Sequence, residues 1–339
     1  MMETMKTAAT ELDGLDHALV QALMVDGRAA FSRLAQVLDV SDQTVIRRYR
    51  RLRTAGLVRV VGLPQGHRVG LFESWLRVQC TPDAALAVAD ALARRPDIAW
   101  VSLNAGGTEV HCITRARTRQ DRDMLLLQQL PGTRRVTGVS AHSILRVYHG
   151  GPRRWRGLDV LSADQVTALE HPVTSDTGAR VRLDEAELAM LAVLARDGRA
   201  GYPELARATG LSDSTVRRRL DHLRDTGAFY VDVEIDPLLL GFETQAMMLA
   251  TVAPGDLATV GAALGEHTEV PFAAAITGAA NLLAVVICRD TDALYAYITE
   301  RIGALRAVQH LEVVPLIRTV KRAGMLTDGS RLVDPPPGG

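Results

Sequence analysis

The sequence predicts an α+β fold in which two winged helix-turn-helix domains alternate with two ferredoxin-like βαββαβ domains. Two observations lead to this prediction. Residues 12–56 recur at 183–227, 171 positions later, and nineteen of the 45 aligned residues are identical. A βαββαβ pattern of strands and helices follows each copy. A repeat at a fixed period indicates a duplicated unit, so we expect two copies that pair within the chain as an intramolecular pseudo-dimer.

Each copy of the repeat has the pattern of a helix-turn-helix. In the first copy, apolar residues at helical spacing predict a first helix that ends just before Asp26-Gly27-Arg28. That tripeptide turns the chain, and its glycine is interpreted as the permissive backbone of a helix end. Ser41 is the expected N-cap of the third helix. The second copy places Asp197-Gly198-Arg199 and Ser212 at the matching positions.

The third helix of each copy is expected to read duplex DNA. Burial of Val45, Tyr49 and Leu52 leaves polar side chains exposed, and in a major groove Gln pairs with adenine and Arg with guanine. Flanking arginines suit phosphate contacts, which position a protein without specifying sequence. The predicted DNA-binding residues are Ser41, Asp42, Gln43, Thr44, Arg47, Arg48 and Arg51 in the first copy and Ser212, Ser214, Thr215, Arg217, Arg218 and Arg219 in the second.

The charge distribution supports this interpretation in part. Net charge is zero, with 39 basic and 39 acidic residues, yet 41–53 carries five arginines against one aspartate. The matching segment 212–224 carries four arginines against two aspartates. Local basic patches on a neutral protein are typical of site-specific DNA binders. Because Lys6 and Lys321 are the only lysines, the patches alone fit an arginine-rich composition equally well. The alternative of an idle recognition face, used only for dimerisation, stays open, above all for the second copy.

The segments after the two copies show matching strand and helix patterns. The first unit is expected to have strands at 71–78, 98–103, 110–114 and 138–148 and helices at 82–94 and 122–130. The second unit has strands at 244–252, 270–276, 282–288 and 308–320 and helices at 254–266 and 291–301. This order is that of the split βαβ arrangement.

The repeats set the predicted domain boundaries. These are a helix-turn-helix domain over 1–61, a βαββαβ domain over 62–149, a linker over 150–182 with a short helix at 162–170, a second helix-turn-helix domain over 183–232, a second βαββαβ domain over 233–325 and a flexible tail over 326–339. The length and Gly/Pro content of the linker let the second unit pair back on the first.

Composition narrows the class of protein further. Cys80, Cys112 and Cys288 show no CxxC spacing, so we expect no metal site and no disulfide scaffold, in keeping with a reducing cytoplasm. No apolar run approaches the roughly 18 residues of a membrane span. The expectation is a soluble, cytoplasmic protein with no membrane partner and no cofactor. An aromatic content of 4% favours duplex DNA over stacked single strands.

Several elements occur in the same order in both units: an LD opening, a DGR turn, a third helix beginning SDxTVxRR, and a βαββαβ segment. In this combination the chain resembles the Lrp/AsnC family of transcriptional regulators over most of both units. The resemblance implies that the βαββαβ domains pair through their sheets and bind an amino acid or similar small effector at domain interfaces. It also implies that dimers assemble into larger homo-oligomers.

The family's effector loop, between the second and third strands of the βαββαβ domain, has a G-x-x-D pattern. Here it reads Gly106-Gly107-Thr108-Glu109 and Gly278-Ala279-Ala280-Asn281, so neither copy keeps the aspartate. Glu109 can pair with an amino group, whereas Asn281 can only hydrogen-bond. The candidate effector-binding residues are Gly106, Gly107, Glu109, Thr277, Gly278 and Asn281. The alternative that both segments are tight turns at an interface stays open.

Two other functions remain as alternatives. Paired units of this kind also resemble siroheme decarboxylases of haem biosynthesis, and His111 and His142 are placed on neighbouring strands where a cleft pair is conceivable. The second unit has Leu283 and Val314 at those positions, and two arginine-bearing recognition helices argue against an enzyme. No catalytic residue is therefore assigned. The third possibility is an amino-acid-binding subunit that does not bind DNA.

Overall fold

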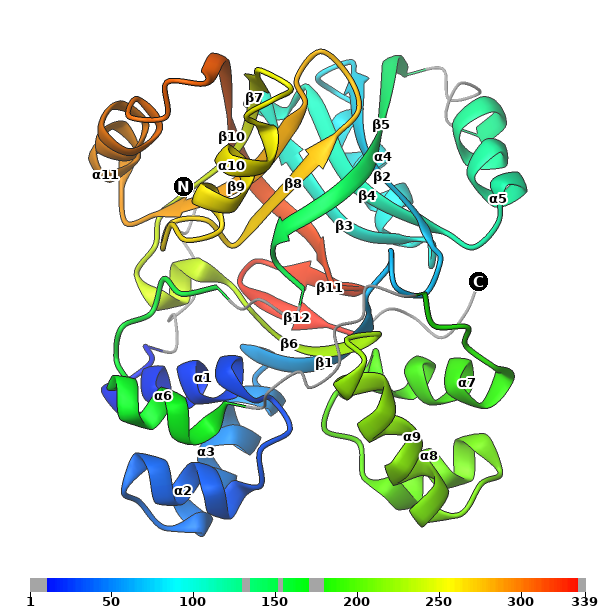
Figure 1. Ribbon diagram of the computed structural model, residues 1–339, viewed down its shortest axis with the longest axis vertical. Coiled ribbons are helices and arrows are strands. Elements are labelled where there is room, and N and C mark those ends of the chain that lie inside the picture. Colours follow the sequence, from blue (N-terminus) through cyan, green and yellow to red (C-terminus); the bar gives the residue numbers. More distant parts are fainter. Residues whose placement is uncertain (1–10, 130–134, 152–154, 171–179, 335–339) are drawn as a thin grey trace, which may run out of the picture.

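The computed structural model describes residues 11–129, 135–151, 155–170 and 180–334. Parts of the predicted first domain, linker and tail, namely 1–10, 152–154, 171–179 and 335–339, lie outside the described residues, as does 130–134. The described chain forms two pseudo-equivalent units. Their helix-turn-helix domains lie side by side at one end of the molecule, and their βαββαβ domains combine at the other (Figure 1).

Each helix-turn-helix domain is a three-helix cluster followed by one strand. The elements of the first are α1 (Gly14–Val25), α2 (Phe31–Leu38), α3 (Asp42–Thr54) and β1 (Val58–Pro64). Those of the second are α7 (Glu185–Leu194), α8 (Tyr202–Thr209), α9 (Asp213–Asp225) and β6 (Phe229–Ile235). The apolar stripe of α3 is buried as predicted, with Val45, Tyr49 and Leu52 each at most 4% exposed.

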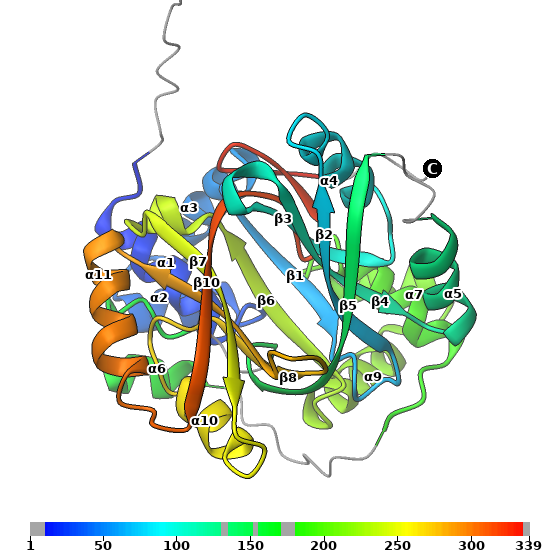
Figure 2. The ribbon, with the colours of Figure 1, turned by 90° about the horizontal axis from the view of Figure 1, so that it is seen from above.

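The strands β1 and β6 pair with each other rather than forming a separate wing on each domain. They run antiparallel, with Val58 opposite Ile235 and Pro64 opposite Phe229. Side chains alternate across this two-stranded sheet. One face joins the cores of the helix-turn-helix domains, and the other faces the βαββαβ domains. This sheet of β1 and β6, the wing sheet, therefore joins the two helix-turn-helix domains to each other and to the βαββαβ domains (Figure 2).

Strands of the two βαββαβ domains close into one barrel within the described residues. Its strands are β2 (Phe72–Cys80), β3 (Ile98–Asn104), β4 (Glu109–Ala116), β5 (Val136–His149), β7 (Thr244–Val252), β8 (Phe272–Ile276), β9 (Leu282–Cys288) and β10 (Val308–Arg322). In each unit the last strand pairs with the first, and the units join where β5 pairs with β8 and β10 pairs with β3. These junctions leave the barrel without a free edge.

Helices cover the outer face of the barrel. They are α4 (Ala85–Ala93), α5 (Arg119–Met124) with the π-helical turn η2 (Leu125–Gln129), α10 (Leu257–Leu264), and α11 (Thr291–Ala296) with the π-helical turn η4 (Tyr297–Ile302). Each unit has its own apolar core between helices and sheet. No helix among the described residues combines the length and apolar character that spanning a bilayer requires.

The linker contributes a fourth helix to the first helix-turn-helix domain. Its helix α6 (Ala163–Leu169) falls within the helical stretch predicted at 162–170 and begins with a Ser162 capping box. Gln165 donates to the carbonyl oxygen of Val37 at 2.7 Å, and Leu169 is fully buried. The second domain has no counterpart of this helix among the described residues.

The prediction of a flexible tail from residue 326 is wrong for the part that the structure describes. There β11 (Met325–Asp328) and β12 (Arg331–Val333) form a hairpin that extends from β10. Leu332 is buried against the wing strand β1, and its amide donates to the carbonyl oxygen of Gly56 at 2.7 Å. The apolar alternation of this hairpin is short and its partners lie far away in sequence, so local patterns do not predict it.

Candidate DNA-binding interface and effector loops

The two recognition helices α3 and α9 begin in the same way. The hydroxyl of Ser41 accepts a hydrogen bond from the amide of Thr44, and that of Ser212 accepts one from Thr215. Both serines are therefore N-caps, which satisfy amides that have no partner within the helix. If either serine contacts DNA as predicted, its hydroxyl does so while it also caps the helix.

Three of the arginines predicted to contact phosphate are held in ion pairs within their own domains. Arg48 donates to Asp13 at 2.6 Å and to the fully buried Asp16 at 2.9 Å, and Arg51 also pairs with Asp16. In the second domain Arg219 pairs with Asp184. These acids stand at the starts of α1 and α7, so the arginines brace the third helix against the first.

Arg47 and Arg218 occupy equivalent places on α3 and α9. Both side chains are exposed, and no ion pair or hydrogen bond of either is found among the described residues. Gln43 and Ser214 are also exposed one turn earlier. Arg217 differs, because its guanidinium lies over the ring of Tyr202 at 4.6 Å. The side chains most available for base contacts are therefore Gln43 and Arg47 in one domain and Ser214 and Arg218 in the other.

The identical DGR turns clasp each other across the pseudo-two-fold axis. Arg28 of the first turn donates to the carbonyl oxygens of Gly198 and Ala200 in the second, at 2.5 and 3.2 Å. Arg199 of the second turn donates to those of Gly27 and Ala29, at 2.5 and 2.8 Å. The repeat had shown that these residues were alike, but not that they bind each other.

A second reciprocal contact reinforces the clasp from the recognition helices. Arg53 at the end of α3 pairs with Asp197 at 2.7 Å, and Arg224 at the end of α9 pairs with Asp26 at 3.1 Å. Each recognition helix is thus bonded to the turn of the opposite domain. Together with the wing sheet, these bonds fix the spacing and orientation of α3 relative to α9.

The glycines of the two turns serve close packing and not a left-handed helix end, which corrects the interpretation drawn from the sequence. Neither Gly27 nor Gly198 has a positive φ. A Cβ on Gly198 would lie 2.7 Å from the backbone carbonyl carbon of Val61, and one on Gly27 would lie 2.5 Å from a methyl carbon of Val231. The turns require glycine because they press against the wing sheet.

The first effector loop contains an open glycine turn and a carboxylate that is already paired. Gly106 and Gly107 have φ values of 67° and 83° with open space around them, in the 3-10 turn η1 (Ala105–Gly107). Glu109 is buried and accepts hydrogen bonds from Arg77 at 2.8 and 2.9 Å. A hydrogen bond from His111 and the charge of Arg77 lower the pKa of Glu109 to about 2. Its assignment to an effector amino group stays a prediction.

The second effector loop is bound to the junction between the units. The Thr277 hydroxyl accepts from the amide of Ser143 on β5 at 2.9 Å. The side chain of Asn281 exchanges two hydrogen bonds with the backbone of Val252. Gly278, at φ 123°, lies against His142 of the other unit. An effector here would have to displace or extend these contacts, and the assignment stays a prediction.

His111 and His142 do not lie on neighbouring strands, contrary to the arrangement considered from the sequence. The first strand β2 lies between β4 and β5, because the last strand of a split βαβ unit pairs with the first. Trp75 on β2 lies between the two histidine rings, and its ring centroid is 5.1 Å from that of His111 and 5.3 Å from that of His142. A direct histidine pair is therefore absent.

Comparison with protein families agrees with this architecture. The AsnC-type helix-turn-helix domain matches residues 12–53 and 183–224, and the Lrp/AsnC ligand binding domain matches 245–326. An uncharacterized HTH-type transcriptional regulator of Pyrococcus abyssi is 30% identical over 146 residues, which are 43% of this chain and 92% of that protein. The regulatory protein AsnC of Escherichia coli is 25% identical over 41% of this chain and 96% of its own. The chain belongs to the Lrp/AsnC family.

The duplicated architecture also occurs in a solved structure. The siroheme decarboxylase NirDL superposes with a TM-score of 0.58 over 92% of this chain and 93% of its own, at 14% sequence identity. At this identity the likeness extends to the fold alone. It agrees with the α+β prediction of two helix-turn-helix and two βαββαβ domains in one chain.

Proposed function

We propose that this protein is a sequence-specific, duplex-DNA-binding transcriptional regulator whose two recognition helices act together as a pseudo-dimer. The observation that carries the proposal is the pair of exposed arginines, Arg47 and Arg218, on helices whose relative position is fixed by the DGR clasp. Rigidly spaced recognition helices match successive major grooves of one duplex. The relatives, named as HTH-type transcriptional regulators, support the same function.

A small metabolite, an amino acid in our proposal, would modulate the affinity for DNA or the assembly of the protein. The match to the ligand binding domain supports an effector of this kind. The ligand would act by changing the balance between arrangements of the two helix-turn-helix domains, or between oligomers, that differ in affinity for DNA. We also propose that the protein works in the cytoplasm and is not an enzyme.

The alternative enzymatic function has one observation in its favour, the overall likeness to NirDL. Against it stand the separation of His111 from His142 by Trp75 and the preservation of two exposed recognition arginines. An assay for binding of a tetrapyrrole distinguishes the two functions. Stoichiometric binding of a tetrapyrrole together with failure to select any DNA sequence would favour the enzyme.

Substituting Arg47 with alanine is expected to weaken operator binding more than substituting Arg218. Each loss should be about 1–3 kcal/mol if the side chain contacts a base, and the more basic first helix is expected to contribute more. The operator is first selected from random duplex DNA, and affinities are then measured at several salt concentrations. Arg119→Ala, an exposed arginine on α5, is the control. Equal losses would refute the ranking, and no loss from either variant would refute the DNA interface.

The selected operator is expected to have two unlike half-sites. Exposed positions differ between the helices: Gln43 corresponds to Ser214, and Arg50 to Asp221. Different side chains at the groove favour different bases. A perfect palindrome among the selected sequences would contradict this expectation.

A further inference from the structure

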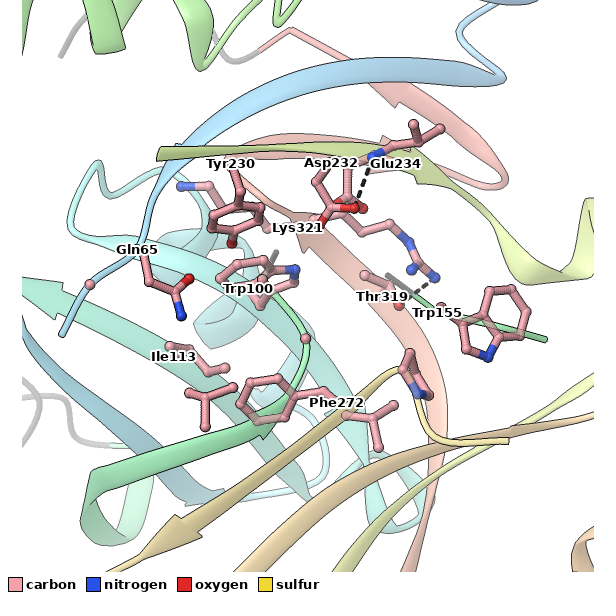
Figure 3. A pocket seen from close by; sticks show the side chains of 18 of the residues that line it. Gln65, Trp100, Ile113, Trp155, Tyr230, Asp232, Glu234, Phe272, Thr319 and Lys321 are labelled. Atoms are coloured by element: carbon pink, nitrogen blue, oxygen red, sulfur yellow. Dashed lines mark hydrogen bonds between the residues drawn. The ribbon is translucent and has the colours of Figure 1, made fainter. Parts of the chain in front are cut away.

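A cavity of about 340 Å³ lies between the wing sheet and the open end of the barrel (Figure 3). It is separate from the effector loops, whose candidate residues are not part of its lining. Tyr230, Asp232 and Glu234 enter it from one face of β6, at alternate positions along the strand. Trp100 and Phe272 reach it from the barrel strands β3 and β8. Its volume is that of a small-metabolite site.

Two carboxyl groups in this cavity have no cationic partner. Asp232 accepts a hydrogen bond from the amide of Val233 at 2.8 Å, and Glu234 is only 7% exposed. Across the described residues, no ion pair of either group is found. Arg59 stands opposite Glu234 in the strand register, but its guanidinium pairs with Asp334 at 3.2 Å. A buried carboxylate without a partner is costly, so a bound cation would stabilise the pair.

The nearby cations are engaged elsewhere. Arg115 pairs with Glu73 at 2.9 Å and lies over the ring of Trp100 at 4.8 Å. The ammonium of Lys321 donates to the carbonyl oxygen of Arg95 at 2.7 Å. The guanidinium of Arg322 donates to the hydroxyl of Thr319 at 3.2 Å. None of these three cations forms an ion pair with Asp232 or Glu234 among the described residues.

Burial raises the pKa values of both carboxyl groups more than the nearby cations lower them. Burial raises the pKa of Glu234 to about 8, the charge of Asp232 adds to the rise, and Arg322 opposes it. Burial raises the pKa of Asp232 as well, against a hydrogen bond from Val233 and the charge of Arg115. A cation close to both groups would reverse these shifts by stabilising the ionised forms.

The rest of the lining suits an organic cation better than a hydrated metal ion. Trp100, Tyr230, Phe272 and Trp155 present aromatic rings, which attract ammonium groups through their π faces. At the barrel end, Nε1 of Trp75 and Nδ1 of His111 are buried without a hydrogen-bond partner.

The acidic pair belongs to the second unit alone. The residues at the matching positions of the repeat, 171 positions earlier on β1, are Val61 and Leu63, which pack against the β11–β12 hairpin. Duplication of the unit by itself would place apolar residues at both positions, as on β1. The two carboxyl groups are thus a departure from the repeat at the place where the cavity lies.

We propose that this cavity binds a small organic cation, a primary or quaternary amine, between the Asp232–Glu234 pair and the surrounding aromatic rings. The site does not depend on whether the protein binds DNA. Because β6 belongs to the wing sheet, an amine bound here contacts the element that joins the two helix-turn-helix domains.

The test uses the full chain without DNA and two cationic probes, choline and n-butylamine, with n-butanol and n-butyrate as neutral and anionic counterparts. Binding is measured by calorimetry and by intrinsic fluorescence, since all three tryptophans of the chain line the cavity. We expect at least one cation to bind with one site per chain, ten-fold or more tighter than the alcohol or the carboxylate. Failure of both cations to bind, or equal binding of butyrate, overturns the proposal.

Two double variants locate the site. Asp232→Asn with Glu234→Gln should weaken binding of the cation at least ten-fold, whereas Asp292→Asn with Glu300→Gln, two exposed acids outside the cavity, should leave it unchanged. Equal affinity in the first variant overturns the proposal. If that variant does not fold, as judged by near-ultraviolet circular dichroism, the comparison of butylamine with butanol on the unaltered chain still decides.

Discussion

Replacing Gly198 with alanine is expected to destabilise the folded protein by about 2–4 kcal/mol, as overpacking against an immobile neighbour does. The new Cβ would lie 2.7 Å from the carbonyl carbon of Val61 and 3.0 Å from its Cα. Both atoms belong to the backbone of β1, and the amide of Gly198 is bonded to the carbonyl oxygen of Val60 at 2.7 Å. Neither side of this contact can retreat without breaking the wing sheet.

The equivalent substitution in the first unit is the informative comparison. A Cβ on Gly27 meets side-chain methyl groups of Val231 and Val60, which can rotate away, so a loss of about 1–2 kcal/mol is expected. Gly14→Ala, where nothing lies within 4 Å, serves as the control for alanine itself. Free energies of unfolding in urea measure all three. Equal stability of Gly198→Ala and Gly14→Ala would contradict the packing argument.

Local patterns in the sequence were sufficient to predict the helices and strands of the fold. Strands β7 and β9 have the predicted bounds, because alternation and flanking turn residues define them over a few positions. The buried stripe of α3 followed from helical spacing for the same reason. The duplication added the pairing of the two units, since each has the same apolar faces to bury.

Contacts between segments far apart in sequence were beyond these patterns. Arg48 and Arg51 were predicted to contact phosphate, but in the fold both pair with Asp16, which precedes them by 32 and 35 positions. The DGR clasp joins residues about 170 positions apart, and identical sequence alone could equally mean two independent turns. The cavity also depends on the packing of the wing sheet over the barrel, although carboxylates on an otherwise apolar strand were a visible signal.

One ion network joins strands of the two units. Arg77 on β2 donates to Glu109 on β4 of its own unit and to Glu312 on β10 of the other, with distances between 2.8 and 3.1 Å. The matching positions of the second unit, 172 residues further along, hold Leu249 and Asn281, which cannot form such a network. Removal of the Arg77 network is therefore expected to affect the whole barrel.

Replacing Arg77 with methionine should lower the free energy of unfolding by about 2–4 kcal/mol at neutral pH, because it leaves the buried Glu109 and its neighbour Glu312 without their shared cation. Arg156→Met, which removes an exposed pair with Glu266, should cost no more than about 1 kcal/mol. Chemical unfolding at pH 7 compares the two variants with the unaltered chain.

The pH dependence separates loss of the ion network from loss of packing. Glu109 has a pKa near 2 in the folded protein, below its ordinary 4.5, so its contribution to stability is present above pH 4.5 and is lost as the pH falls toward 2. Without Arg77 this pKa rises, and Glu109 is protonated at a higher pH. The stability difference between Arg77→Met and the unaltered chain should therefore narrow between pH 5 and pH 3. A difference that stays constant over this range would mean that Arg77 stabilises the barrel through its packing alone.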